Sequence, residues 1–114
     1  MIGALAWMNL VSGDSSLMAE ASGLLTKSLS LFFTTDSITE LCENTKAGCS
    51  RDAQGFKAVY VRNLAYLYRQ TTDSSVKSAI QNAIDSSVTA MVTRSCDAQW
   101  NCNGSASCAL LEPD

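Results

Sequence analysis

The side chains that could do chemistry in this sequence are mainly carboxylates, cations and cysteines. The 114-residue chain has eleven Asp and Glu residues, eight Lys and Arg residues and no histidine. Without histidine, the commonest general base and a common metal ligand are both absent. No two acidic residues are adjacent. The spacing of Glu40 and Glu43 suits neither one face of a strand nor any helix expected here, so we do not interpret them as a catalytic pair.

Five cysteines in so short a chain indicate an oxidising compartment. No Cys-x-x-Cys pair is present, and the sequence predicts no metal site and no cofactor. Cys42 and Cys49 flank the polar loop CENTKAGC, and we expect them to form a disulfide. Spacing leaves the pairing of the last three cysteines open. We expect Cys96 to bond Cys102, which leaves Cys108 over.

Composition and charge exclude some classes of partner. The net charge is −3 and the cations are spread along the chain, so nucleic acid is not an expected partner. No apolar run reaches the ~20 residues of a membrane helix, so a membrane contact would need an anchor outside this sequence. The apolar opening MIGALAWMNLV has no cationic start typical of a signal peptide and no N-cap residue. So abrupt a start leads us to expect that the sequence is part of a longer chain.

Four stretches are predicted to be helices. Two of them carry one apolar stripe at steps of three and four, and both open with Asp-Ser-Ser, at Asp14 and Asp73, which are good N-cap residues. Each of these two stretches follows another whose apolar residues would lie on nearly every side of a helix. The links SGD and TTD are short, which makes each pair of helices antiparallel. The expected helices span residues 2–12, 14–33, 53–71 and 73–95.

The pattern therefore predicts an all-α fold of two antiparallel αα-hairpins, each with a buried inner helix and a one-faced outer helix. Between the hairpins we expect a short extended piece and the disulfide loop. Repeated hairpins with two layers are typical of an α-toroid, and two hairpins cannot close such a ring. We expect residues 1–114 to form a single incomplete toroid domain, with a Cys-, Gly- and Ser-rich tail over 96–114. A plain four-helix bundle is the alternative.

IGALAWMNLVSGDSSLMAEASGLL, at the start of the chain, and a second stretch in its middle resemble glycoside hydrolase family 76, and its fungal members in particular. The first stretch resembles the family's Ile-Gly-Gly/Ala-Leu segment, Thr-Gly-Asp turn and following helix. SITELCENTKAGCSRDAQGFKAVYVRNLAYLY is similar to its Leu-x-Glu-x-Cys segment, second cysteine, Asp, and Gln-Phe-Lys-Gly-Ile-Phe-x-Arg-x-Leu motif. The resemblance covers residues 2–95. In the second stretch the matching positions are Glu40, Cys42, Cys49, Asp52, Phe56, Lys57 and Arg62.

The resemblance implies an (α/α)6 toroid that acts on α-1,6-linked mannan by a retaining mechanism. The family's catalysts are an adjacent Asp-Asp pair, in which one carboxylate attacks the anomeric carbon and the other protonates the leaving oxygen and then activates water. This sequence has no such pair, which we expect to lie before Met1. It also has Ala58 in place of a usual glycine, an intruding Gly55, and no closing helix after Cys96. We expect no catalytic residue in this chain, which alone should be inactive.

The resemblance also implies a substrate-binding role for Asp52, Phe56 and Lys57, because the leading end of an inner helix faces the central cleft of a toroid. Phe56 could stack on a pyranose face, and the two charged groups could hydrogen-bond sugar hydroxyls. The alternative is a structural ion pair that holds the loop to the helix, which we favour for Arg62 and leave open for the others. Its candidate members are Lys57, Arg62, Asp36, Glu40 and Asp52.

We therefore expect part of a secreted or cell-wall hydrolase whose partner is α-mannan or mannoprotein polysaccharide. The NGS sequon at Asn103 agrees with secretion. Two other functions stay open. One is a non-catalytic mannan-binding or wall-associated module, and the other is a small disulfide-stabilised helical protein with a protein partner. The last should be a closed monomer, whereas part of a toroid exposes the flanks of its inner helices.

Overall fold

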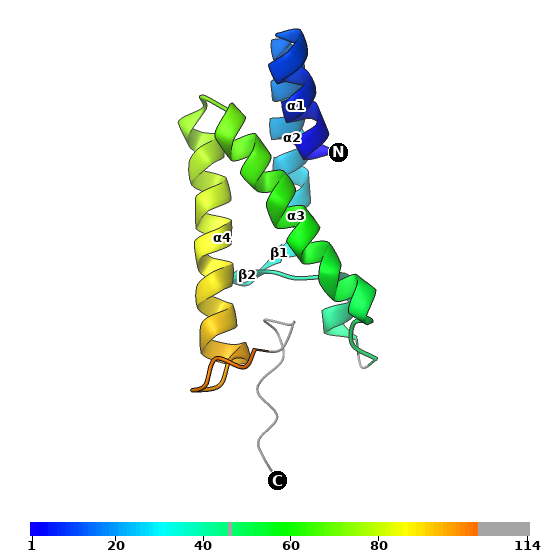
Figure 1. The fold of residues 1–114 in the computed structure, drawn as a ribbon, viewed down its shortest axis with the longest axis vertical. Coiled ribbons are helices and arrows are strands. Elements are labelled where there is room, and N and C mark those ends of the chain that lie inside the picture. Colours follow the sequence, from blue (N-terminus) through cyan, green and yellow to red (C-terminus); the bar gives the residue numbers. More distant parts are fainter. Residues whose placement is uncertain (46, 103–114) are drawn as a thin grey trace.

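The computed structural model describes residues 1–45 and 47–102, apart from the side chains of Arg51 and Gln54. The chain forms four α-helices, which are α1 (Ile2–Ser12), α2 (Ser15–Phe32), α3 (Arg51–Gln70) and α4 (Ser74–Ser95). Between α2 and α3 lie the strands β1 (Phe33–Thr34) and β2 (Ser37–Ile38) and the 3-10 helix η1 (Leu41–Asn44). Helices α1 and α2 run antiparallel, as do α3 and α4 (Figure 1).

All four predicted helices are present, with bounds within two residues of those expected. Helix α3 begins two residues early because the Ser50 hydroxyl accepts a hydrogen bond from the Ala53 backbone N–H at 3.2 Å. The expected extended piece is a two-stranded antiparallel hairpin. A mostly helical fold with the two helical hairpins is thus confirmed. The four helices do not close a ring among the described residues, so the toroid stays a prediction (Figure 1).

The core joins the two helical hairpins through α3. Four large side chains are almost fully buried, and they come from three helices: Leu25, Leu64, Leu67 and Ile80. Helix α1 comes close to α3 at Gly3, where an added Cβ would lie 2.4 Å from the Asn63 side-chain oxygen. A larger residue than glycine therefore cannot stand at this crossing unless Asn63 moves.

The strand hairpin attaches the first helical hairpin to α4. Ile38 is buried, and its backbone N–H donates to the Ser87 hydroxyl at 2.8 Å. Asp36, in the turn of the same hairpin, forms an ion pair with Arg94 near the end of α4. The short strands therefore hold the C-terminal end of α2 beside α4, and the groove described below lies next to this contact.

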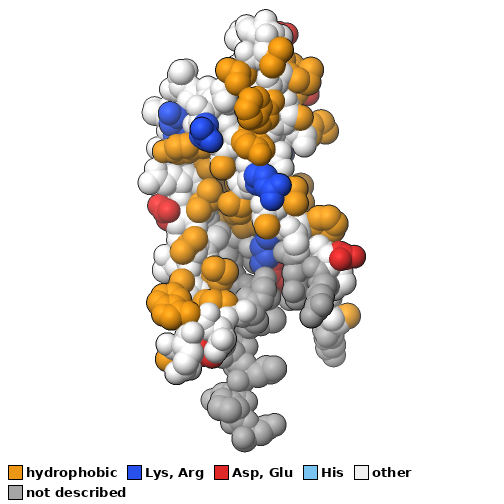
Figure 2. All heavy atoms as spheres, viewed as in Figure 1, with side chains coloured by type: hydrophobic (Ala, Val, Ile, Leu, Met, Phe, Trp, Pro, Cys, Tyr) orange, Lys and Arg blue, Asp and Glu red, His pale blue; other side chains and the backbone are white. Residues whose placement is uncertain are grey.

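Helices α1 and α3 were expected to be inner helices, and each has an exposed apolar side, which is the expectation stated for part of a toroid. Orange apolar side chains gather on the face seen in Figure 2. On these two helices the exposed large apolar residues are Trp7, Met8, Leu10, Val11, Phe56, Val59 and Tyr68. Apolar flanks of this extent usually mark a surface that another part of a protein covers.

The two Asp-Ser-Ser starts fold as N-caps of different strength. The Asp14 carboxylate accepts from the Ser16 backbone N–H at 3.0 Å. The Asp73 carboxylate accepts from two backbone N–H groups, those of Ser75 at 2.8 Å and Val76 at 3.4 Å. Hydrogen bonds from the serine hydroxyl and backbone lower the pKa of each aspartate below its usual 3.8.

These caps predict a pH-dependent stability. Asp73→Ala should lower the melting temperature at pH 7 more than Asp14→Ala, because it leaves two N–H groups without an acceptor. Since the folded pKa is depressed, the stabilisation is complete above the usual pKa and is lost as the pH falls through the folded pKa. The difference between wild type and Asp73→Ala should therefore shrink on acidification.

Thermal melts from pH 7 downwards measure this effect. Asp85→Ala is the matched control, because Asp85 is exposed within α4, well after its first turn. A difference between wild type and Asp73→Ala that stays constant down to the acid limit of folding would contradict the capping role.

Candidate functional site

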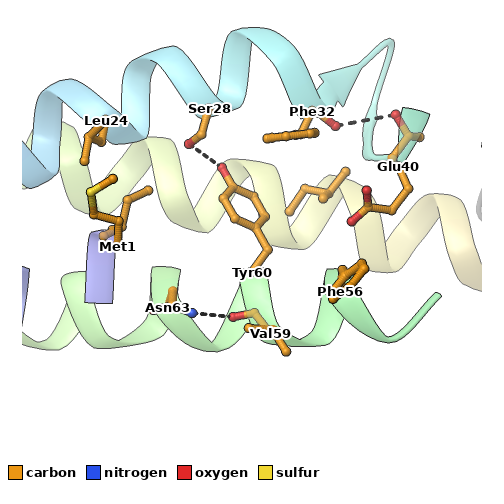
Figure 3. A pocket seen from close by; sticks show the side chains of 12 residues that line it. Met1, Leu24, Ser28, Phe32, Glu40, Phe56, Val59, Tyr60 and Asn63 are labelled. Atoms are coloured by element: carbon orange, nitrogen blue, oxygen red, sulfur yellow. Dashed lines mark hydrogen bonds between the residues drawn. The ribbon is translucent and has the colours of Figure 1, made fainter. Parts of the chain in front are cut away.

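A groove of about 450 Å3 lies between α2, α3 and the segment that follows β2 (Figure 3). Most of its lining is apolar, and Glu40 carries the one charged side chain in that lining. The groove is lined by Met1, Ile2, Leu24, Ser28, Phe32, Ile38, Thr39, Glu40, Phe56, Val59, Tyr60 and Asn63. An open apolar site with few polar groups is the usual form of a ligand site.

Helix α3 forms one side of the groove because four of its residues share a face. Phe56, Val59, Tyr60 and Asn63 recur at helical spacing. Phe56 is 60% exposed and Val59 is 49% exposed, so both lie at the rim. The Asn63 amide is occupied, since it donates to the Val59 carbonyl at 2.8 Å. The groove therefore offers an accessible aromatic ring at one end of this face.

Tyr60 crosses from α3 to α2 inside the groove (Figure 3). Its hydroxyl lies 2.6 Å from the Ser28 hydroxyl, and its ring lies 5.8 Å from that of Phe32. Burial raises the pKa of Tyr60, and the hydrogen bond to Ser28 opposes this shift only in part. Tyr60 is thus a neutral phenol near pH 7, suited to hydrogen bonding and not to service as a base.

The segment carrying Glu40 is fixed by η1. The Glu40 backbone N–H donates to the Glu43 carboxylate at 2.8 Å, and the Glu43 N–H donates to the Glu40 carbonyl at 3.0 Å. The disulfide between Cys42 and Cys49 closes the same loop. These bonds hold the backbone of Glu40 in place while its side chain lines the groove.

Lys57 joins this loop to α3. Its ammonium lies 2.5 Å from the Glu43 carboxylate, and the two side chains are 18% and 1% exposed. An ion pair for Lys57 was one of the two predicted roles, but the expected partners Asp36, Glu40 and Asp52 were wrong. Glu43 is the partner of Lys57 because η1 brings the Glu43 carboxylate to α3. Asp36 pairs with Arg94 instead.

The other sequence-predicted residues lie outside the groove. Asp52 is exposed one turn before Phe56 on α3 and does not line the groove. Arg62 is exposed and forms no ion pair within the part of the chain that the structure describes, so its favoured structural role is not found. Of the three predicted substrate-binding residues, Phe56 alone lines the groove. The sequence reasoning missed Tyr60 and Glu40 as groove residues.

Two disulfides lie among the described residues, and both are pairs that were expected, although spacing alone left the second of them open. Cys42 bonds Cys49 with an S–S distance of 2.01 Å, and Cys96 bonds Cys102 at 2.03 Å. Cys108 and Asn103 lie outside the described residues. Among residues 1–45 and 47–102, no cluster of metal-binding side chains exists and no helix is long and apolar enough to span a membrane. The two disulfides fit an extracellular protein.

A family model matches residues 1–110 of the chain. The family is Glycosyl hydrolase family 76, and the chain belongs to it. The family resemblance noted from the sequence is therefore confirmed. No curated protein and no solved structure matches the chain.

Breaking the pair of Lys57 and Glu43 should destabilise the fold. Lys57→Met removes a cation from beside the almost fully buried carboxylate of Glu43, which should lower the free energy of unfolding by about 3 kcal/mol. Adding Glu43→Leu should recover part of this loss, because the buried charge is then removed as well. Urea denaturation at pH 7 measures both variants.

Lys27→Met is the matched control, since Lys27 is exposed on α2. Its effect should stay within about 0.5 kcal/mol. If Lys57→Met behaves like Lys27→Met, the pair does not hold the loop to the helix.

Proposed function

We propose that this chain forms part of the wall of a mannan-binding cleft in a glycoside hydrolase that acts on α-1,6-linked mannan by a retaining mechanism. The proposal is supported by membership of family 76 over residues 1–110. The observation that carries it is the groove beside α3, where the exposed ring of Phe56 and the carboxylate of Glu40 line one site.

This pairing of groups suits a sugar. A pyranose has a face of C–H bonds that can rest on an aromatic ring, whose face carries partial negative charge. Phe56 offers such a ring at the rim. The hydroxyls at the edge of the same sugar can donate to the carboxylate of Glu40, and charge-assisted hydrogen bonds of this kind are among the stronger ones. We propose these two side chains as the main sugar contacts.

The roles of Asp52 and Lys57 differ in this proposal. Asp52 is exposed one turn before Phe56, where it can accept a hydroxyl of a neighbouring sugar unit. Lys57 is engaged with Glu43, so its proposed contribution is to hold the loop that carries Glu40. The substrate contact would then depend on Lys57 through the position of the loop.

The exposed apolar flanks of α1 and α3 support the proposed toroid. In an (α/α)6 ring each inner helix lies between two other inner helices. Here the inner helices α1 and α3 contact each other and their outer partners α2 and α4, so among the described residues each has one inner neighbour. Trp7 is 48% exposed and Val11 is 86% exposed, both on α1. Further helical hairpins of the same enzyme would cover such residues. The alternative, a closed monomer with a protein partner, gives no reason for exposed apolar flanks on both inner helices.

Catalysis is not proposed for residues 1–114 alone. Retaining hydrolysis needs two carboxylates about 5 Å apart across the anomeric carbon. The groove is lined by a single carboxylate, Glu40, and the sequence has no adjacent acidic pair. A non-catalytic mannan-binding module is the second candidate function, and it would use the same groove residues. Both candidates place the protein outside the cell or at the cell wall, in keeping with its disulfides.

The chain should bind α-1,6-mannan oligosaccharides without cleaving them. Phe56→Ala should weaken binding about tenfold, which corresponds to the loss of one stacking contact. Glu40→Gln should also weaken binding, because a neutral amide accepts hydroxyl hydrogen bonds less strongly. Titration calorimetry measures the affinities, and chromatography of the oligosaccharides reveals any shorter product.

Leu41→Ala is the control, because Leu41 is 72% exposed and does not line the groove. Binding that Phe56→Ala leaves unchanged would refute the groove as the sugar site. Turnover that disappears on replacing Glu40 or Asp52 would refute the claim that this chain lacks the catalytic carboxylates.

A further inference from the structure

Helix α1 presents an apolar stripe on its exposed side. Four of its residues follow one another at steps of three and one, and then three, which places them on one side of the helix, and all four are exposed: Ala4, Trp7, Met8 and Val11. No residue of α1 is charged. Apolar residues at this spacing are the form in which a helix docks into a groove on another protein surface. The stripe is therefore a surface that a groove of matching character can cover.

The second helical hairpin has such a groove, a furrow of about 220 Å3 between α3 and α4. Most of its lining is apolar, and among the described residues it shares none of that lining with the groove beside α2. Since a helix is about 10 Å across, the furrow has room for side chains of a helix and not for the helix itself. The furrow is lined by Ala65, Tyr68, Arg69, Ile80, Gln81, Ile84 and Asp85.

The apolar surface continues from the furrow along α4. Val88, Met91 and Val92 are between 37% and 50% exposed. Val88 follows Ile84 by four residues, and the other two follow Val88 by three and four, so these side chains share one side of α4. They belong to the same predicted stripe as the buried Ile80 and lie beyond the part of it that the core covers. The furrow and this side of α4 thus form one uncovered apolar surface.

Cations predominate around the furrow. Arg62 and Arg69 are exposed two turns apart on α3, and Arg69 lines the furrow. The Lys77 ammonium lies 5.4 Å from the centre of the Tyr68 ring, which also lines it. Asp85 is the one acidic residue of the lining. Three cations against one carboxylate favour a partner surface that is neutral or acidic.

The charges beside the stripe of α1 are acidic. Asp14, in the link between α1 and α2, and Glu20, on the part of α2 that follows this link, are both exposed. Lys27, the one cation of the first hairpin, lies two turns further along α2. The first hairpin therefore matches the furrow in apolar character and opposes it in charge.

We propose that the exposed stripe of α1 docks on the furrow between α3 and α4 of a second copy of this chain. A second copy is favoured because one chain carries both of these complementary surfaces. Within one copy α1 already packs against α3, where Gly3 meets Asn63 and the ring of Trp7 lies 5.8 Å from that of Tyr66. The furrow lies on another side of α3, so both contacts can exist together.

Such a contact joins different surfaces of the two copies, so association does not have to stop at a dimer. Three copies of two hairpins would supply the six hairpins of an (α/α)6 ring, a step that rests on the proposed fold. The pairwise contact itself does not rest on mannan binding. A sugar titration on dilute, monomeric chain tests the groove separately.

Sedimentation equilibrium of the full chain measures this association. One helix stripe on a furrow makes a small interface, for which we expect a Kd of the order of 100 µM. The average mass should be close to the 12.2 kDa of one chain at low concentration. It should exceed twice that value at about 1 mM, ten times the expected Kd.

Two variants each remove one half of the contact. Met8→Lys puts a cation into the stripe, and Ala65→Arg fills the furrow with a long charged side chain; both positions are exposed in one copy. Each variant alone should stay monomeric at the concentration at which the natural chain associates. An equimolar mixture should form dimers and nothing larger, because each pair keeps one intact stripe and one intact furrow.

Leu31→Lys is the matched control, since Leu31 is 64% exposed on α2 and belongs to neither surface. This variant should associate like the natural chain. Circular dichroism melts establish that each variant is folded. Should Met8→Lys unfold, Val11→Lys places the same charge on the same stripe.

Three results would overturn the proposal. One is a natural chain that stays monomeric at about 1 mM, which would leave both surfaces to other partners. Another is an association that Met8→Lys abolishes and Ala65→Arg leaves intact, because it would indicate a contact between two α1 helices. The third is a mixture of the two variants that stays monomeric although the natural chain associates.

Discussion

The whole arrangement depends on the burial of one stripe of α3 between the two helical hairpins. Leu64 and Leu67 are both fully buried there. Side chains leave a helix in directions set by its periodicity. Once the buried stripe of α3 is oriented, the directions of its other faces are therefore set as well. It turns Phe56 and Val59 toward the groove and Lys57 toward η1. The position of the candidate sugar site is thus a consequence of core packing.

The loop between β2 and α3 makes the second side of the site, and it is held by bonds of different kinds. The disulfide of Cys42 and Cys49 restrains the loop in the unfolded chain as well as in the folded one. The pair of Glu43 and Lys57 acts in the folded state alone, and it selects where the loop lies against α3. Together they keep the segment that carries Glu40 at the groove. The entropic cost of ordering this segment when a sugar binds is therefore smaller.

Local features of the fold could be predicted from the sequence, and features that depend on distant contacts could not. Asp14 and Asp73 mark helix starts because a cap needs only the next few residues. The ion pair of Lys57 was assigned to wrong partners, since the position of Glu43 depends on the short helix η1. The groove role of Glu40 was missed for the same reason. The apolar residues around α3 predicted a helix buried by its neighbours. An apolar side chain does not show which neighbouring elements are present to bury it.

The central claim is that the groove beside α3 receives a mannan oligosaccharide. Its most direct test is a nuclear magnetic resonance titration of the isotope-labelled chain with α-1,6-mannotriose. The account predicts that the shifted backbone amides cluster at Glu40, Phe56 and Tyr60, which come from two separate segments that meet in the groove. Shifts confined to the loop around Trp100, or no shift at millimolar sugar, would contradict it.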